Sequence, residues 1–142
     1  MTIHTDCRHY RTTEPCEPHK ETGTRCDGCA VYEPIAERIL IVKLGAMGDV
    51  LRTTTCLEPL KQRYPASHIT WVTHENAVPL LEGNPWIDRI LSVDGNYLEF
   101  VLAERFDLAI GPDTDTLSAS ITSLVRADIK HAVDREVAEQ CV

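Results

Sequence analysis

The sequence predicts an α/β domain with a Rossmann-like parallel sheet and helices on both faces, preceded by an irregular, cysteine-rich segment. Beyond residue 37, short apolar runs alternate with helical patterns, which is typical of parallel strands joined by crossover helices. The run Ile39–Val42 is continuously apolar, as expected of a strand that is buried on both faces. We therefore expect a leader over residues 1–34 and an α/β domain over residues 35–142.

The remaining elements follow from periodicity in chain order. Apolar residues recur at spacings of three and four from Val50 to Tyr64, which predicts a helix over residues 49–64. Pro59 removes one backbone hydrogen bond, so we expect this helix to kink or end early. The last residues, 134–142, are expected either to add one helical turn or to fray. The other predicted elements are strands over residues 68–73, 89–93 and 107–110, and helices over residues 77–81, 97–104 and 117–125.

Composition and charge narrow the class of protein. The 142 residues suffice for one domain with a hydrophobic core. The net charge of −8 argues against a nucleic-acid-binding protein, which needs a basic surface. No apolar run approaches the roughly 20 residues that span a bilayer, and the first residues lack the features of a signal peptide. These observations predict a cytoplasmic protein without a membrane span.

The loop after the first strand contains two glycines, Gly45 and Gly48, which flank Ala46 and Met47. Glycines allow a sharp turn and a close approach of a ligand to the backbone. A Gly-x-x-Gly pair alone is a weak signal, and the Gly-x-Gly-x-x-Gly fingerprint of dinucleotide-binding proteins is absent. The loop therefore predicts a ligand site without naming the ligand.

Asp49 follows this loop, at or near the start of the predicted helix. Its carboxylate could cap the helix by accepting from backbone N–H groups of the first turn. Alternatively, it could act as a general base that takes a proton from a substrate hydroxyl. Lys43 and Arg52 lie nearby in the sequence and could neutralise phosphate or carboxylate groups, or could be ordinary solvated charges.

The leader is marked by cysteines, with His9 and His19 between them. Without a secretion signal, clustered cysteines favour metal ligands over disulfides. A Cys-x-x-Cys turn presents two thiolates to a tetrahedral ion, and a histidine could replace one of the other ligands. A structural zinc ion is the first interpretation, an iron–sulfur cluster the second and free thiols the third. The candidate ligands are Cys7, Cys16, Cys26 and Cys29.

Several further side chains follow predicted strands. Asp113 and Asp115 could meet substrate hydroxyls or a cation, although turn and N-cap roles are favoured. His74 could point toward the same site, although a polar loop at the strand end is the simpler interpretation. Trp71 is expected in the core, and Trp86 either in the core or on a sugar-stacking surface.

The pattern of these motifs resembles family 9 glycosyltransferases, the lipopolysaccharide heptosyltransferases. The resemblance implies a GT-B architecture, in which the N-terminal half receives a lipid A core sugar and the C-terminal half holds ADP-heptose. It also implies that Asp49 is the base of an inverting transfer that needs no metal for its chemistry. The likeness covers roughly residues 38–130 and rests on residues 39–54, 64–65, 69–73, 80–90 and 106–108.

The sequence ends at Val142, about where the first of two such domains would end, so we expect the donor half to lie outside it. A fragment, a stand-alone relic and a partner-dependent subunit all remain open. Without a positioned donor, this chain alone should not transfer sugar. The alternative function is a non-catalytic α/β binding module with a metal-stapled N-terminal arm.

The resemblance also implies partners. The acceptor would be a sugar or a lipid-linked sugar, and the donor a nucleotide sugar bound through a second domain or a partner chain. Peripheral association with a membrane is compatible with such an acceptor. The predicted substrate-binding residues around Asp49 are Lys43, Gly45, Ala46, Met47, Gly48 and Arg52.

Overall fold

The structure, a computed structural model, describes residues 2–11 and 14–132. The chain divides into two units, residues 1–36 and residues 37–142. The helical turn expected over residues 134–142 lies outside the described residues, as does Cys141.

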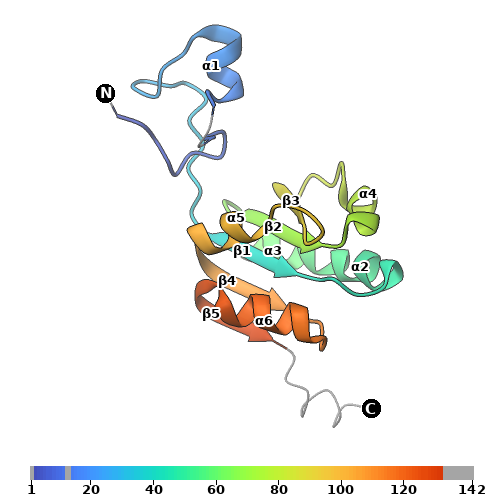
Figure 1. Cartoon of the computed structure of the whole chain (residues 1–142). Helices are drawn as coiled ribbons and strands as arrows, with labels where there is room; N and C mark the ends of the chain where they lie inside the picture. The colour runs from blue at the N-terminus through green and yellow to red at the C-terminus, as the bar shows by residue number, and fades with distance from the viewer. Residues whose placement is uncertain (1, 12–13, 133–142) are drawn as a thin grey trace. The chain divides into compact units, whose positions relative to one another are not determined.

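The second unit is built on a five-stranded sheet in which all neighbouring strands are parallel (Figure 1). This confirms the predicted fold class. The strand order is β3-β2-β1-β4-β5, so the chain builds outward from β1 to β3 and then continues on the other side of β1. The order therefore reverses between β1 and β4. The strands are β1 (Arg38–Val42), β2 (His68–Thr73), β3 (Arg89–Ser92), β4 (Arg105–Gly111) and β5 (Arg126–Ala132).

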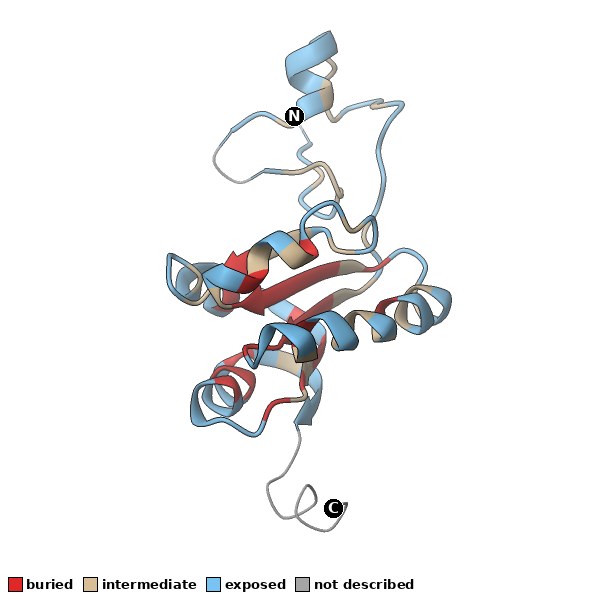
Figure 2. Ribbon diagram, turned by 90° about the vertical axis from the view of Figure 1, so that its right-hand side faces the viewer, coloured by how far each residue is buried: buried red, intermediate tan, exposed pale blue. Residues whose placement is uncertain are grey.

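Helices cover both faces of the sheet and close one core on each face. The apolar side chains of β1 alternate between these two cores. Ile39 and Ile41 face one core, while Leu40 and Val42 face the other, and all four are fully buried. Figure 2 shows that much of the buried part of this unit lies in the strands of the sheet. The continuous apolar run is thus explained by burial on both sides. The first core is closed by α2 (Met47–Thr53), α3 (Leu57–Arg63) and α4 (Val78–Leu81), the second by α5 (Leu98–Ala103) and α6 (Thr116–Leu124).

The helix predicted over residues 49–64 is interrupted, as Pro59 suggested, but the break comes earlier. A 3₁₀ segment, η1 (Thr54–Cys56), separates α2 from α3. Pro59 lies in the first turn of α3, where its missing N–H costs little. The hydroxyls of Thr54 and Thr55 donate to carbonyls three residues back, at 2.6 and 2.8 Å, in the 3₁₀ segment. A second 3₁₀ segment, η2 (Glu75–Ala77), precedes α4.

Besides the two 3₁₀ segments, one strand and one α-helix were not predicted. Strand β5 pairs with β4 at the edge of the sheet, and its residues are mostly exposed, so they lack an apolar signal. In the first unit, helix α1 (Glu17–Thr22) ends at Gly23, which has a left-handed backbone with φ of 70°. An isolated antiparallel bridge joins Cys7 to Pro34. The leader is therefore more regular than expected.

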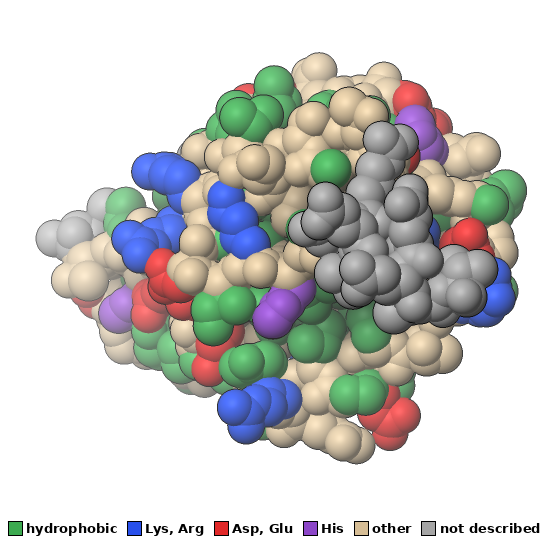
Figure 3. All heavy atoms as spheres, turned by 90° about the horizontal axis from the view of Figure 1, so that it is seen from below, with side chains coloured by type: hydrophobic (Ala, Val, Ile, Leu, Met, Phe, Trp, Pro, Cys, Tyr) green, Lys and Arg blue, Asp and Glu red, His purple; other side chains and the backbone are tan. Residues whose placement is uncertain are grey.

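The described surface mixes apolar and charged side chains. On the face drawn in Figure 3, hydrophobic side chains reach the surface between Lys, Arg, Asp and Glu. Exposed large hydrophobics include Leu117 and Leu124 of α6 and Ile129 of β5. Among the residues that the structure describes, no helix has the length and apolar character that a membrane crossing requires.

Candidate functional site

A buried carboxylate fixes the loop that leaves the carboxyl end of β1. Asp113, from the loop after β4, accepts hydrogen bonds from the backbone N–H groups of Leu44 (2.6 Å) and Gly45 (3.0 Å). Its other oxygen accepts from Lys43 Nζ. Lys43 and Asp113 are 7% and 8% exposed. The two loops at the reversal of strand order are therefore locked together, with Asp113 in a positioning role rather than a turn or cap role.

The two glycines of this loop differ in the space around them. A Cβ at Gly45 would lie 2.9 Å from Lys43 Nζ and 3.1 Å from Asp113 Oδ1, so a side chain there would force the buried pair to shift. A Cβ at Gly48 would meet no atom within 4 Å. Neither glycine has a positive φ. The close approach of Lys43 and Asp113, rather than a left-handed turn, explains Gly45.

Asp49 is the third residue of α2, not its cap. The N-cap is Ala46, and no side-chain hydrogen bond caps this helix, so the capping interpretation of Asp49 is wrong. Its carboxylate instead pairs with Arg52 on the next turn. The side chain of Asp49 is 46% exposed and that of Arg52 is 82% exposed. A carboxylate in the first turn also benefits from the positive end of the helix dipole.

The predicted substrate-binding residues fall into two groups. Gly45, Ala46, Met47 and Gly48 are all exposed, as is Arg52, so a ligand could reach each of them. Lys43 is different, because it is buried against Asp113. The structure gives its ammonium group a protein partner, and any contact with substrate stays a prediction.

The other candidates after strands have mostly structural partners. Asp115 caps α6 by accepting from the N–H groups of Leu117 (3.0 Å) and Ser118 (3.1 Å), which confirms the N-cap interpretation. The Ser118 hydroxyl donates to the Val42 carbonyl at 3.2 Å and ties α6 to the end of β1. Trp71 is fully buried, as predicted, whereas Trp86 is partly exposed at the surface.

His74 meets a carboxylate from the next strand end. Its Nδ1 lies 3.2 Å from both oxygens of Asp94, which also accepts from the N–H of Glu75 at 2.8 Å. The bond from the Glu75 backbone, followed by that from His74, lowers the pKa of Asp94. His74 is therefore a loop residue paired across β2 and β3, as the simpler interpretation expected.

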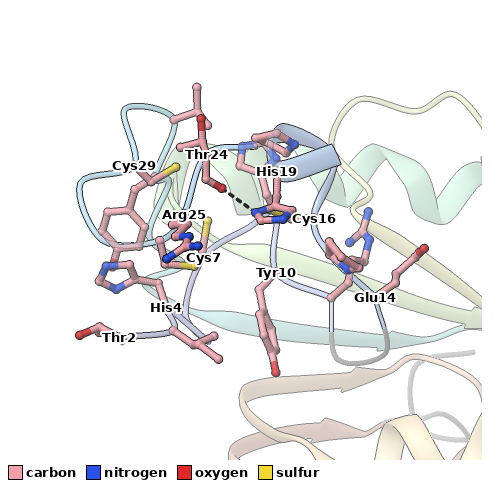
Figure 4. A pocket seen from close by; sticks show the side chains of 18 residues that line it. Thr2, His4, Cys7, Tyr10, Glu14, Cys16, His19, Thr24, Arg25 and Cys29 are labelled. Atoms are coloured by element: carbon pink, nitrogen blue, oxygen red, sulfur yellow. Dashed lines mark hydrogen bonds between the residues drawn. The ribbon is translucent and has the colours of Figure 1, made fainter. Parts of the chain in front are cut away.

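The cysteines of the first unit share one cavity. Cys7, Cys16, Cys26 and Cys29 are free thiols of intermediate burial. All four line a cavity of about 440 Å³, together with His9 and His19 (Figure 4). Within residues 2–11 and 14–132, no three His, Cys, Asp or Glu side chains already meet in an arrangement that could hold a metal ion.

The curated proteins and solved structures that this chain resembles are heptosyltransferases and related glycosyltransferases. No protein-family model matches the chain. Lipopolysaccharide heptosyltransferase 1 of Escherichia coli K12 is 25% identical over 120 residues, which is 72% of this chain and 38% of the relative. Lipopolysaccharide heptosyltransferase 3 of Escherichia coli is 23% identical over 100 residues, which is 61% of this chain and 29% of the relative.

Solved structures give the same result. The E. coli heptosyltransferase WaaC with ADP aligns with a TM-score of 0.62 and 28% identity, over 71% of this chain and 36% of that one. The family 9 glycosyltransferase from Veillonella parvula aligns with a TM-score of 0.58 and 27% identity, over 69% and 32%. The chain spans 38% and 29% of the length of the two curated relatives described above. In sequence and in fold, it resembles the N-terminal part of the family 9, heptosyltransferase-like glycosyltransferases.

Proposed function

We propose that residues 37–142 form the acceptor-side domain of an inverting, heptosyltransferase-like glycosyltransferase, with Asp49 as its general base. One observation carries the proposal. Asp49 is a partly exposed carboxylate just beyond the carboxyl end of β1, where the strand order reverses between β1 and β4. Open α/β sheets bind their ligands outside the carboxyl ends of the strands at such a reversal. The similarity to heptosyltransferases supports the class of reaction.

The proposed chemistry uses Asp49 to activate an acceptor hydroxyl. The hydroxyl oxygen attacks the anomeric carbon of the donor sugar while the bond from that carbon to the nucleotide diphosphate breaks on the opposite face. The anomeric configuration is inverted, and the hydroxyl proton passes to the Asp49 carboxylate. The nucleoside diphosphate leaves with the electron pair of the broken bond.

Arg52 and Asp113 support this base in different ways. Arg52 pairs with Asp49 and is otherwise exposed, so it orients the carboxylate and can also meet an acidic group on an incoming acceptor. Asp113 holds the backbone of Leu44 and Gly45 and thereby fixes the loop that leads to Asp49. Precise placement of the base matters because proximity and orientation account for much of a bimolecular rate enhancement.

The substrates are proposed from the named neighbours. Two solved neighbours contain ADP and ADP-2-deoxy-2-fluoro heptose. For this chain we propose an ADP-linked heptose as the donor, held by a second domain or a partner chain. The acceptor that we propose is a sugar of the lipid A core, presented free or on its lipid.

The test joins this chain to the donor-binding half of E. coli lipopolysaccharide heptosyltransferase 1 and measures transfer from ADP-heptose. The variant is Asp49→Asn, which keeps the size of the side chain and removes its basicity. The matched control is Glu58→Gln, an exposed carboxylate in the first turn of α3.

We expect Asp49→Asn to lower kcat by about 10²–10⁴-fold, the range for loss of a general base, with little change in the acceptor KM. Glu58→Gln should retain the activity of the parent. Equal activity in the two variants would remove Asp49 as the base.

A further inference from the structure

The first unit has an ordered backbone but no core of its own. In the described part of residues 2–36, no residue is buried (Figure 2). Short segments that bury little apolar surface are commonly held in one structure by disulfides, by a structural metal ion or by association with another chain. The five described cysteines, including the four of this unit, are free, so disulfides do not supply the link.

Backbone pairing places Cys7 near the end of the unit. The Arg8 N–H donates to the Glu33 carbonyl at 2.8 Å, and the Ile35 N–H donates to the Asp6 carbonyl at 2.7 Å. These bonds flank the bridge between Cys7 and Pro34. The pairing therefore places Cys7 beside residues 33–35, which follow Cys29 closely in the sequence.

The other three thiols come from a turn and a helix start. The Cys29 N–H donates to the Cys26 carbonyl at 3.2 Å, which closes a tight turn, and Gly28 within it has a φ of 76°. Such a Cys-x-x-Cys turn directs two thiolates to one ion. Cys16 is the N-cap residue of α1 and makes no capping hydrogen bond through its side chain. Three separate stretches of the unit therefore each bring sulfur to the same cavity.

We infer that Cys7, Cys16, Cys26 and Cys29 bind one structural zinc ion, which holds residues 2–36 together. The supporting observations are the shared cavity, the free thiols and the missing core. Four thiolates are a common ligand set of structural zinc sites. Because no metal-binding arrangement of three such side chains is already formed among the described residues, the loops must close around the ion. Metal binding is then coupled to the folding of the unit.

Three histidines line the cavity, and each has a partner in the protein. His4 Nδ1 lies 3.9 Å from a carboxylate oxygen of Asp6. His19 Nδ1 lies 2.8 Å from the Thr24 carbonyl, as the dashed line in Figure 4 shows. His9 Nε2 lies 3.6 Å from the carboxylate of Glu33. We assign all three histidines to the support of the loops and the four thiolates to the ion.

The test is elemental analysis of the full chain, purified from cells grown with zinc and iron. We expect one zinc ion per chain and only traces of iron. The double variant Cys26→Ser/Cys29→Ser should lose the zinc. The matched control is Cys56→Ser, which alters a free cysteine of the second unit and should leave the zinc content unchanged.

Several results would overturn the assignment. These are a chain without stoichiometric zinc, equal zinc in the double variant and the parent, or loss of zinc in Cys56→Ser. Stoichiometric iron together with an absorption band at about 400 nm would show that the four thiolates hold an iron–sulfur cluster instead of zinc. A His19→Gln variant that loses zinc while Cys16→Ser retains it would contradict the set of four thiolates.

A second measurement covers the case in which the variants fold poorly. Trypsin can cut the first unit at Arg8, Arg11, Lys20 and Arg25. Chelation of the parent chain should speed cleavage at these sites by about tenfold or more, because the folding of the unit depends on the ion. Cleavage within the second unit should keep its rate. If the chelator leaves the rate of cleavage in the first unit unchanged, a zinc ion does not hold this unit together.

Discussion

At the scale of single residues, the pair of Lys43 and Asp113 does the most to shape the candidate site. Both side chains are buried, and they come from loops 70 residues apart in the sequence. The sequence suggested both residues as candidates, but their pairing could not be predicted from it, because only the adjacency of β1 and β4 brings them together. Asp49 could be found from its loop, whereas its place within the helix could not, because Ala46 gives no capping signal.

Removal of the Asp113 charge should destabilise the second unit. Asp113→Asn leaves the Lys43 ammonium buried without a counter-charge, which typically costs about 3–5 kcal/mol. The control is Asp128→Asn, whose partner Arg105 is 74% exposed, so the loss of that solvent-screened pair should change the free energy of unfolding very little. Urea unfolding followed by tryptophan fluorescence measures both, since Trp71 and Trp86 lie in the second unit. Similar losses in the two variants would show that the buried pair has no special role.

His68 should make the stability of the second unit depend on pH. Burial lowers the pKa of His68 to about 4 from 6.5, although the nearby Asp88 carboxylate raises it. The unfolded chain therefore binds more protons between these pH values, so the free energy of unfolding should fall as the pH drops from 6.5 toward 4. The expected loss is roughly 1–3 kcal/mol. A His68→Gln variant should show a smaller loss on acidification; an unchanged pH profile would contradict the assignment.

At the scale of elements, the helices and strands that could be predicted are those whose apolar residues are buried. Strands β1 and β2 were placed to within one residue because both are buried. The break in the predicted helix was expected at Pro59 but lies at residues 54–56, before α3. Strand β5 was missed because it is an exposed edge strand, and α1 because none of its residues is buried. Hydrophobic periodicity reports burial, so elements without burial leave no trace in it.

The loop after β1 should distinguish its two glycines. Gly45→Ala pushes a methyl group against Lys43 and Asp113 and should destabilise the unit by about 1–3 kcal/mol. Gly48→Ala meets open space in the first turn of α2 and should be neutral or stabilise by up to about 1 kcal/mol. Thermal or urea unfolding of the pair is the check. A destabilising Gly48→Ala beside a harmless Gly45→Ala would contradict the packing described for this loop.

At the scale of the whole molecule, the two units have different proposed tasks. The second unit presents the partly exposed Asp49 carboxylate and an exposed glycine loop at the reversal of its sheet, and we propose that it receives the acceptor sugar. The first unit lacks a core, and we propose that zinc holds it. The sequence alone pointed to the four cysteines and to Asp49 as candidates, but the cavity that the cysteines share is visible only in the structure.

The most direct test of the central claim is acceptor binding to this chain, followed residue by residue in NMR spectra of the ¹⁵N-labelled protein. Titration with a lipid A core oligosaccharide should shift the amide signals of residues 45–52, which surround Asp49. Asp49→Asn should retain this binding, because the proposed base acts on the proton of the hydroxyl rather than on affinity. Signals that do not move in residues 45–52, or shifts confined to other parts of the chain, would contradict an acceptor site at the end of β1.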